Sequence, residues 1–246
     1  MSLNSPQNYS IMKAYLAFRL KGTTTFLPIG NAPAFVYEPE VENTEHFSSQ
    51  VGPKVKDADI VLQVGANLSL TLDEITAQNI ALVVNGTIGS LIQPAVSEAV
   101  VNVGAVISEQ VIDIGSLNVT DISFVDNNDV TLVENVDYKV ISHESGIYVF
   151  TASQNGVVAT VTAGAIEESE KRSIISILSA PEGIEGEFMV VGTGTGRRLK
   201  GTGIYANLKS ASGLGLISED ISQIELTGSV LRQPGPYPFG KFEQTN

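Results

Sequence analysis

The sequence contains no cysteine and no tryptophan, and it has only two histidines in 246 residues. Without cysteine, disulfide bridges, thiolate zinc sites and thiol nucleophiles are all excluded. The histidines, His46 and His143, lie far apart in the sequence, and neither has a second histidine at ligand spacing. We therefore expect no metal site, no cofactor and no enzymatic activity.

Basic residues are also scarce. The chain has 14 Lys and Arg against 27 Asp and Glu, which gives a formal net charge of -13. Proteins that hold nucleic acid neutralise its phosphates with a basic surface, so this composition disfavours stable DNA binding. The acid is concentrated in the middle of the chain, because residues 86–170 contain twelve acids and a single base, Lys139.

Long hydrophobic runs are missing as well. The longest apolar runs, such as residues 80–84, fall far short of the ~20 residues that cross a bilayer, so we expect no membrane insertion. Residues 1–9 have neither a basic segment nor an apolar segment, so we expect no secretory signal. With 43% hydrophobic and 17% charged residues, the chain is apolar enough to fold around a core.

The residues that are present indicate an all-β fold. Short runs of Val, Ile, Thr, Tyr and Phe alternate with Gly, Asn, Asp and Pro, a pattern typical of a β-sandwich or barrel. In residues 67–73 the alternation places Leu68, Leu70 and Leu72 on one face. One short helix is predicted over residues 75–84, with Thr76 as its N-cap.

We predict a single domain over residues 1–246 with three special regions. Residues 38–57 are predicted to form a long irregular loop, and residues 110–166 a central acidic hairpin region in which His143 to Gly146 form a turn. Residues 233–246 form a proline-rich C-terminal arm. Because proline cannot donate to a sheet ladder, we expect this arm to lie extended against something else.

Two motifs that could indicate enzyme chemistry do not have the necessary context. Residues 201–206, Gly-Thr-Gly-Ile-Tyr-Ala, match a dinucleotide-binding pattern, but the strand and helix that this pattern requires on either side are not predicted. Asp73 and Glu74 are adjacent carboxylates, yet neighbouring strand residues point to opposite faces, which disfavours joint acid–base work.

Several segments, taken in order, resemble the tail tube proteins of long-tailed bacteriophages. They begin with Ile29-Gly-Asn-Ala-Pro-Ala-Phe35 and its continuation to residue 49, followed by Lys54-Val-Lys-Asp57 and by Leu70-Thr-Leu-Asp73 and its continuation to residue 82. Residues 132–150 are similar to the central hairpin of that family, and residues 208–231 to its closing strand pair. The proline-rich segment from Pro234 onward departs from the family pattern.

The resemblance implies a β-sandwich or barrel with one flanking helix. It further implies hexameric rings with a continuous inner β-barrel, stacked into a hollow tube through which the genome passes without specific binding. The implied partners are other copies of the chain and the tape measure, tail terminator and baseplate or tip proteins. The implied location is the phage tail of the virion, with host cytoplasm as the place of assembly.

The same resemblance suggests two sets of site residues. The expected contact between rings comprises Tyr37, Glu38, Glu40, Glu42, Glu45, His46 and Phe47. The expected lumen-facing residues are Asp59, Gln63, Ser69, Thr71, Asp73, Gln223, Glu225 and Thr227. The first set follows from the length of the predicted loop over residues 38–57 and from its aromatic residues among acids. The second set takes alternate residues of the long strands.

An alternative function is a carbohydrate-binding or adhesin-like β-sandwich. Sugar-binding surfaces commonly use aromatic faces, and the absence of tryptophan counts against this alternative. The two functions differ in the particles they predict, since a tube protein forms rings or polymers and a binding module does not.

Overall fold

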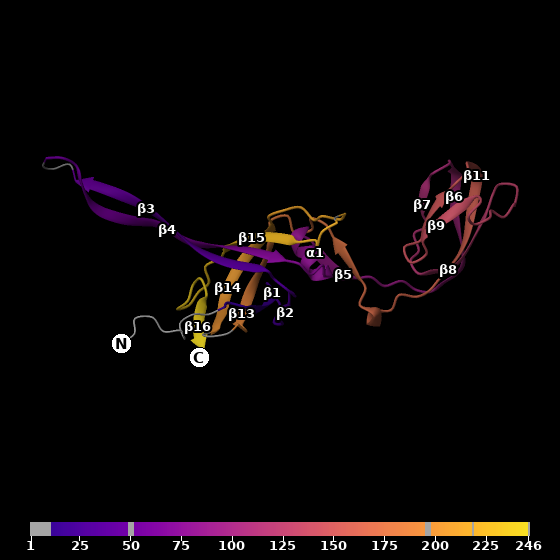
Figure 1. Ribbon diagram of the computed structural model, residues 1–246. Coiled ribbons are helices and arrows are strands. Elements are labelled where there is room, and N and C mark those ends of the chain that lie inside the picture. The colour runs from indigo at the N-terminus through magenta and orange to yellow at the C-terminus, as the bar shows by residue number, and fades with distance from the viewer. Residues whose placement is uncertain (1–10, 49–51, 195–197, 218, 246) are drawn as a thin grey trace. The chain divides into compact units, whose positions relative to one another are not determined.

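The computed structural model describes residues 11–48, 52–194, 198–217 and 219–245. These residues form β-strands, one short α-helix and one 3-10 turn, which confirms the all-β prediction with a flanking helix. Contacts divide the chain into two compact units (Figure 1). Unit 1 contains residues up to 88 and from 175 onward, and unit 2 contains residues 89–174. Where the sequence predicts one domain over residues 1–246, the contacts form two compact units, the second inserted within the first.

Unit 1 is built on one antiparallel sheet. Its strand order is β2-β1-β13-β14-β15-β4-β3, and β16 pairs with the first half of β14. The elements are β1 (Ala14–Leu20), β2 (Leu27–Pro28), β3 (Ala34–Ser48), β4 (Val55–Leu72), α1 (Ala77–Val83), β13 (Ile184–Gly192), β14 (Arg198–Ser210), β15 (Ile224–Val230) and β16 (Lys241–Thr245).

The sheet of unit 1 curls around its inner face. Phe18 on β1 and Phe35 on β3 both contact Phe188 on β13, with ring centroids 4.9 and 5.3 Å apart. Since β1 and β3 lie toward opposite edges of the sheet, these contacts bring the two edges together over one core. Gly186 permits the close approach of β1, because a Cβ at this position would lie 2.3 Å from the ring of Phe18.

Helix α1 closes one end of this core. Thr76 is the N-cap, as predicted, and its side chain accepts a hydrogen bond from the backbone N–H of Asn79 at 3.2 Å. The buried Asn79 amide donates to the carbonyls of Ile29 and Glu74, both at 2.9 Å. Asn79 therefore ties the helix to the segment that follows β2.

Unit 2 consists of two three-stranded antiparallel sheets, β6-β11-β8 and β7-β10-β9. Their bounds are β6 (Val96–Val106), β7 (Val111–Asp113), β8 (Val119–Val125), β9 (Tyr138–Ser142), β10 (Ile147–Phe150) and β11 (Gln154–Ala163), with a 3-10 turn at Glu168–Glu170. Strands β5 (Thr87–Ser90) and β12 (Ser173–Ser176) form a two-stranded sheet where the chain enters and leaves this unit.

The core of unit 2 is centred on Phe124. Its ring packs edge-on against Tyr138, Tyr148 and Phe150, with centroids 4.7, 5.5 and 5.3 Å away. The predicted hairpin turn at His143 to Gly146 is confirmed, because it joins β9 to β10. None of these aromatic residues belongs to the core of unit 1, so each unit has its own core.

Two sequence predictions need correction. The long loop over residues 38–57 is instead part of a hairpin, since β3 continues to Ser48 and β4 begins at Val55. Its many acids suggested a loop, but they pair in register with β4 along nearly the whole strand. The C-terminal arm lies on its own chain, because β16 pairs with residues 198–202 of β14.

Replacing Phe124 with alanine tests the independence of the two cores. We expect Phe124→Ala to lower the free energy of unfolding of unit 2 by about 3–5 kcal/mol, because the change leaves a cavity among packed rings. Hydrogen exchange measured peptide by peptide should show faster exchange in unit 2 and unchanged exchange in β13 and β14. Equal loss of protection in both units would contradict separate cores.

Candidate functional site: a projecting hairpin and a polar sheet face

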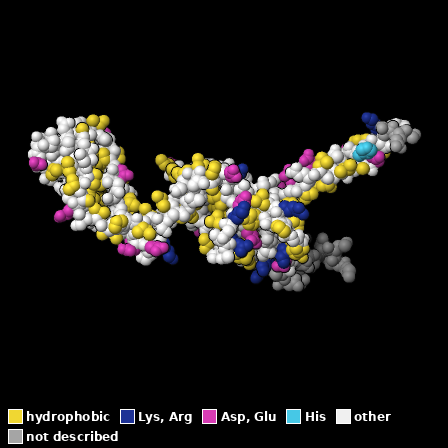
Figure 2. All heavy atoms as spheres, turned by 180° about the vertical axis from the view of Figure 1, so that it is seen from behind, with side chains coloured by type: hydrophobic (Ala, Val, Ile, Leu, Met, Phe, Trp, Pro, Cys, Tyr) yellow, Lys and Arg dark blue, Asp and Glu magenta, His cyan; other side chains and the backbone are white. Residues whose placement is uncertain are grey.

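The distal half of the β3–β4 hairpin projects from the sheet of unit 1 (Figure 1). We call this part, residues 39–48 of β3 and 55–65 of β4, the arm. No described side chain in it is buried. Figure 2 shows hydrophobic and acidic side chains mixed along it. The exposed large apolar residues of the arm are Val41, Phe47, Val55, Ile60, Val61, Leu62 and Val64.

The two faces of the arm differ because of a bulge. Glu38, Glu40 and Glu42 alternate along β3, so they lie on the same face. The register shifts between Glu42 and Asn43 and leaves Leu62 as the extra residue on β4. Because of this extra residue, the β4 residues directly before Leu62 point to the opposite face from the one they would occupy in a strand without a bulge.

The opposite face carries an ion-pair cluster near the tip. Lys56 Nζ lies 2.8 Å from Glu45 and 3.3 Å from Asp59, and the hydrogen bond to Glu45 raises the pKa of Lys56. His46 lies on the face of Glu42 instead, and its Nδ1 lies 2.6 Å from Asp57. The predicted residues Glu45 and His46 therefore interact within the arm, while the Phe47 side chain remains 45% exposed.

Tyr37 does not behave as an exposed anchor. Its hydroxyl donates to the Phe239 carbonyl at 3.1 Å, and its ring lies edge-on to Phe242 at 5.8 Å. Burial raises the pKa of Tyr37. Of the seven residues predicted for the ring contact, Tyr37 therefore holds the C-terminal segment against β3, and the other six remain on the exposed hairpin.

Four of the predicted lumen residues come together on the outer face of β4 and β15. Glu225 is paired with Thr71, and Thr227 with Ser69. Each of these four side chains points away from the core, because the residues between them in the sequence, such as Leu70 and Leu226, are buried. The alternation in the sequence therefore correctly predicted which face of these two strands is exposed to solvent.

The other four predicted lumen residues are placed differently. Gln63 faces Glu42 farther out on the arm. Asp59 is paired with Glu45 and, because of the bulge at Leu62, lies on the other face, which corrects its assignment to the same surface. Asp73 and Gln223 lie just beyond the ends of β4 and β15, where Asp73 accepts a hydrogen bond from Asn31 at 2.7 Å.

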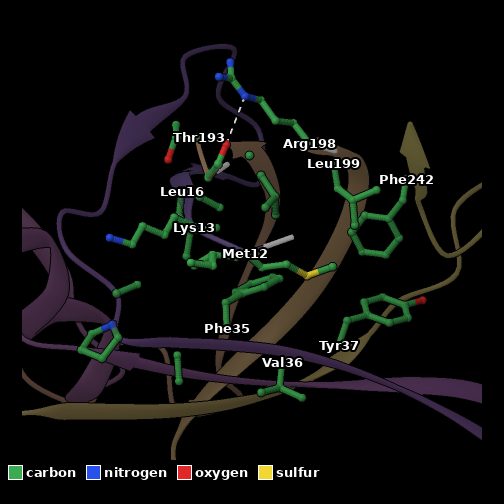
Figure 3. A pocket seen from close by; sticks show the side chains of 18 of the residues that line it. Met12, Lys13, Leu16, Phe35, Val36, Tyr37, Thr193, Arg198, Leu199 and Phe242 are labelled. Atoms are coloured by element: carbon green, nitrogen blue, oxygen red, sulfur yellow. Dashed lines mark hydrogen bonds between the residues drawn. The ribbon is translucent and has the colours of Figure 1, made fainter. Parts of the chain in front are cut away.

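A groove opens on the inner side of the curled sheet, between the start of β1, the β13–β14 connection and β3 (Figure 3). It has a volume of about 1190 Å³. Sequence reasoning missed this groove, because its lining residues come from separate segments that no local pattern connects. It also missed the exposed apolar residues Leu216 and Ile217, which were read as part of a strand pair.

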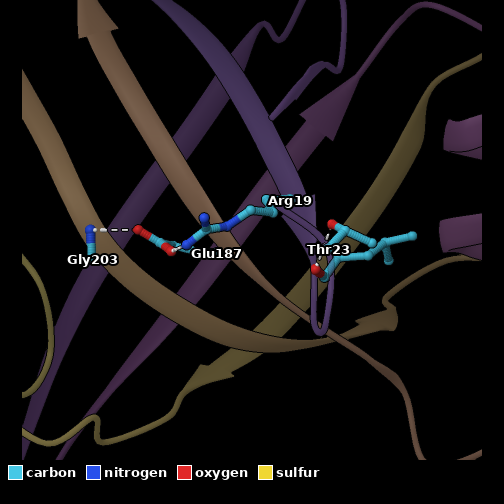
Figure 4. A network of polar contacts seen from close by, with 5 residues as sticks. Arg19, Thr23, Glu187 and Gly203 are labelled. Atoms are coloured by element: carbon cyan, nitrogen blue, oxygen red, sulfur yellow. Dashed lines mark hydrogen bonds and ion pairs between the residues drawn. The ribbon is translucent and has the colours of Figure 1, made fainter. Parts of the chain in front are cut away.

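On the outer face of β1, β13 and β14, basic side chains are paired with acids. Arg19 forms an ion pair with Glu187, whose other oxygen accepts a hydrogen bond from the Gly203 N–H at 3.2 Å (Figure 4). Lys21 likewise binds Glu185, and this hydrogen bond raises the pKa of Lys21. These pairs leave little uncompensated positive charge on this part of the sheet.

Within the described ranges, no group of three or more His, Cys, Asp or Glu residues is arranged to hold a metal ion. His143 contacts the Tyr148 hydroxyl at 3.1 Å and so packs on the core of unit 2. In the same described part of the chain, none of the helices has the length and apolarity needed to cross a membrane.

Comparison with known proteins identifies a family that the chain matches. Residues 13–242 match the model of a family described as protein of unknown function UCP028589. The match covers both units and the arm. No curated protein matches the sequence.

The arm can be removed without touching either core. We expect a variant in which Asn-Gly replaces residues 42–63 to fold, because Val41 and Val64 are directly opposite and a two-residue turn can join them. Its free energy of unfolding should stay within about 1 kcal/mol of the intact chain, since no described residue removed is buried. Denaturant unfolding and circular dichroism measure both. A collapsed or unfolded variant would show that the arm supports the fold.

Proposed function

The chain belongs to the UCP028589 family, and we propose that it is a structural virion protein, the tail tube subunit of a long-tailed bacteriophage. Subunits assemble into hexameric rings, and the rings stack into a hollow tube that conducts the genome. The observation that carries this proposal is the arm, whose apolar side chains find no partner surface within the described part of the subunit.

The arm needs a neighbouring molecule to bury its apolar residues. A two-stranded hairpin by itself is marginally stable in water, and an exposed apolar surface of this kind marks an interaction site. Val61 and Val64 are 55% and 54% exposed. Packing of the arm on a subunit of the next ring would remove this surface from water, with the exposed acids Glu40 and Glu42 at its rim.

The sheet edges support ring closure. Among the described residues, β3 pairs only with β4, and β4 pairs with β15 only along residues 67–72. Long unpaired edges are templates for further strand pairing. In the proposed ring these edges pair between adjacent subunits, which would produce one continuous inner barrel.

The outer face of β4 and β15 suits the lumen of such a tube. On this face Ser69, Thr71 and Thr227 present hydroxyl groups, and Glu225 adds a carboxylate. A basic side chain also occurs here, because Lys209 on β14 is paired with Thr227. With a net charge of -13, the subunit repels phosphate more than it binds it. DNA would therefore pass without being held.

The same assembly surfaces would meet the other tail proteins. At the ends of a tube, the unfilled contact surfaces of the last ring are available to the tail terminator and to the baseplate or tip, and the lumen is available to the tape measure. Assembly takes place in the host cytoplasm, and the product is part of the virion.

Electron microscopy of the purified full chain tests the proposal. We expect rings of six subunits and tubes in the intact protein, and folded but unpolymerised subunits in the variant that lacks residues 42–63. A matched control with Val100→Ser and Ile107→Ser, two exposed positions in unit 2, should polymerise normally. An intact protein that stays monomeric at all salt and protein concentrations would refute the tube function.

Addition of positive charge to the proposed lumen gives a second test. We expect tubes of a Ser69→Lys and Thr227→Lys variant to protect short double-stranded DNA from nuclease at low salt, because lysines facing the passage bind phosphate. A Thr120→Lys control places its lysine on unit 2 and should protect no DNA. Equal nuclease sensitivity of DNA with the lumen variant and with the intact protein would show that this face is not the lumen.

A further inference from the structure

One face of the arm is apolar and continues the core face of the sheet. Val41 and Val64 are directly opposite each other and lie on the same face as the buried Leu70, because each is an even number of residues away along the ladder. Beyond the bulge, Val61 is opposite Asn43 and returns to this face. We call it the inner face of the arm. All three valines are more than half exposed, although they continue a face that is buried nearer the core.

The other face of the arm is acidic. Glu40 and Glu42 lie on it, and so does Ile60 beyond the bulge, because Ile60 is opposite Thr44. The whole arm contains five acids and one lysine. A surface that receives the inner face must therefore be apolar and must not repel acids.

The groove of unit 1 offers an apolar surface of this kind. Figure 3 shows Leu16, Phe35, Leu199 and Phe242 around one space. Met12 also lines the groove, and its side chain is 77% exposed. In a chain with almost twice as many acids as bases, none of the described residues that line the groove is acidic.

Both charged side chains that line the groove are basic. Arg198 donates to the Gly194 carbonyl at 3.3 Å, so it already has a backbone partner. Lys13 is exposed and is the base available to the acids of an incoming segment. The groove therefore matches the arm both in apolar surface and in the sign of its charge.

We propose that the inner face of the arm of one copy packs in the groove of a second copy. This inference rests on the proposed function, in which the arm contacts a neighbouring subunit, and it identifies the surface that receives the arm. The contact buries the valines of the inner face and leaves the acidic face toward water. With a volume of about 1190 Å³, the groove exceeds the ~300–1,000 Å³ typical of small-molecule sites and suits a chain segment.

The ladder of the arm excludes the groove of the same copy as the receiving surface. Pro39 lines that groove, and every residue of β3 from Pro39 to Ser48 is paired with β4. The strand therefore stays extended and leads away from the groove (Figure 1). At ~3.3 Å per residue, Asn43 and the opposite Val61 lie roughly 13 Å beyond Pro39. Val61 could enter its own groove only if the ladder broke.

The arm and the groove are different surfaces, so each copy can use both at once. A copy gives its arm to one neighbour and receives the arm of another, and the contact propagates from subunit to subunit. This is the geometry that stacked rings need.

A cysteine pair tests the contact directly. The chain has no native cysteine, so single thiols can be introduced at Met12 in the groove and at Val61 on the inner face. When Met12→Cys and Val61→Cys are mixed and oxidised, we expect at least about tenfold more disulfide-linked heterodimer than from Met12→Cys and Ile60→Cys. Ile60 is the matched control, because it is similarly exposed and lies on the opposite face. A tag on one variant separates the mixed dimer by mass.

Serine substitutions show which face of the arm contributes to assembly. We expect Val61→Ser with Val64→Ser to raise the minimum protein concentration for polymers by about tenfold, because two apolar side chains lose their contact. Val55→Ser with Ile60→Ser changes two apolar residues of the opposite face and should leave this concentration unchanged. All four side chains are 49–62% exposed, so both variants should fold. Sedimentation measures the polymer and circular dichroism checks the fold.

Charge at the groove gives an independent measurement. Met12→Glu places an acid where the acidic arm is received, and we expect it to raise the minimum concentration for polymers. Met12→Lys changes the same exposed side chain to a base and should not raise it.

The competing occupant is residues 1–10 of the same chain, which lead directly into the groove at Ile11. Thiol labelling of Met12→Cys at assembling concentrations separates the two occupants. We expect the thiol to become more reactive when Val61→Ser and Val64→Ser are added. A thiol that becomes more reactive only when residues 1–10 are removed would overturn the proposal.

Failure of the contact and failure of the tube function give different results. Equal cross-linking of the Val61 and Ile60 variants, or normal tubes from the Val61 and Val64 double variant, would overturn the arm–groove contact and leave the tube function standing. If the intact protein forms no polymer, the tube function fails, and the cysteine pair at high concentration still decides the contact.

Discussion

Burial of one face of a curled sheet is the constraint on which unit 1 depends. Phe18, Phe35 and Phe188 come from three strands, and their contacts hold the two sides of the sheet over a single core. The alternation of side chains then forces the intervening residues outward. The same geometry therefore creates the core, the polar outer face and the groove that remains open where the curl is incomplete.

The extension of β3 and β4 beyond this core creates the arm. Ala66, Leu68 and Leu70 are buried on β4, but the residues before them have no core to cover. The β3–β4 ladder nevertheless continues beyond the core. Backbone hydrogen bonds and the ion pairs of Lys56 near the tip hold the two strands together there, instead of buried side chains. A segment held together in this way keeps its shape while leaving its apolar residues available to another molecule.

Unit 2 is inserted into the chain of unit 1 and has a core of its own. The chain leaves unit 1 within β5 and returns to it within β12, and the residues in between form a separate aromatic core around Phe124. Much of the acidic charge of the chain lies in this unit. The exposed hairpin of unit 1 and the acidic charge of unit 2 are thus separate features of one chain.

Local patterns in the sequence determined the strand-rich fold, the N-cap at Thr76, the turn at His143 to Gly146 and the wet faces of β4 and β15. These features depend on neighbouring residues, so periodicity and turn chemistry suffice to predict them. Residues 38–57 were predicted as a loop because a run of charged residues resembles a solvated turn. Residues 38–48 form a strand instead, because they pair with β4. The placement of Asp59 depends on a bulge that adds one residue to a ladder, and no local pattern marked it. The groove, the division into two units and the docking of β16 on β14 were decided by tertiary structure alone, because each arises from contacts between segments far apart in the chain.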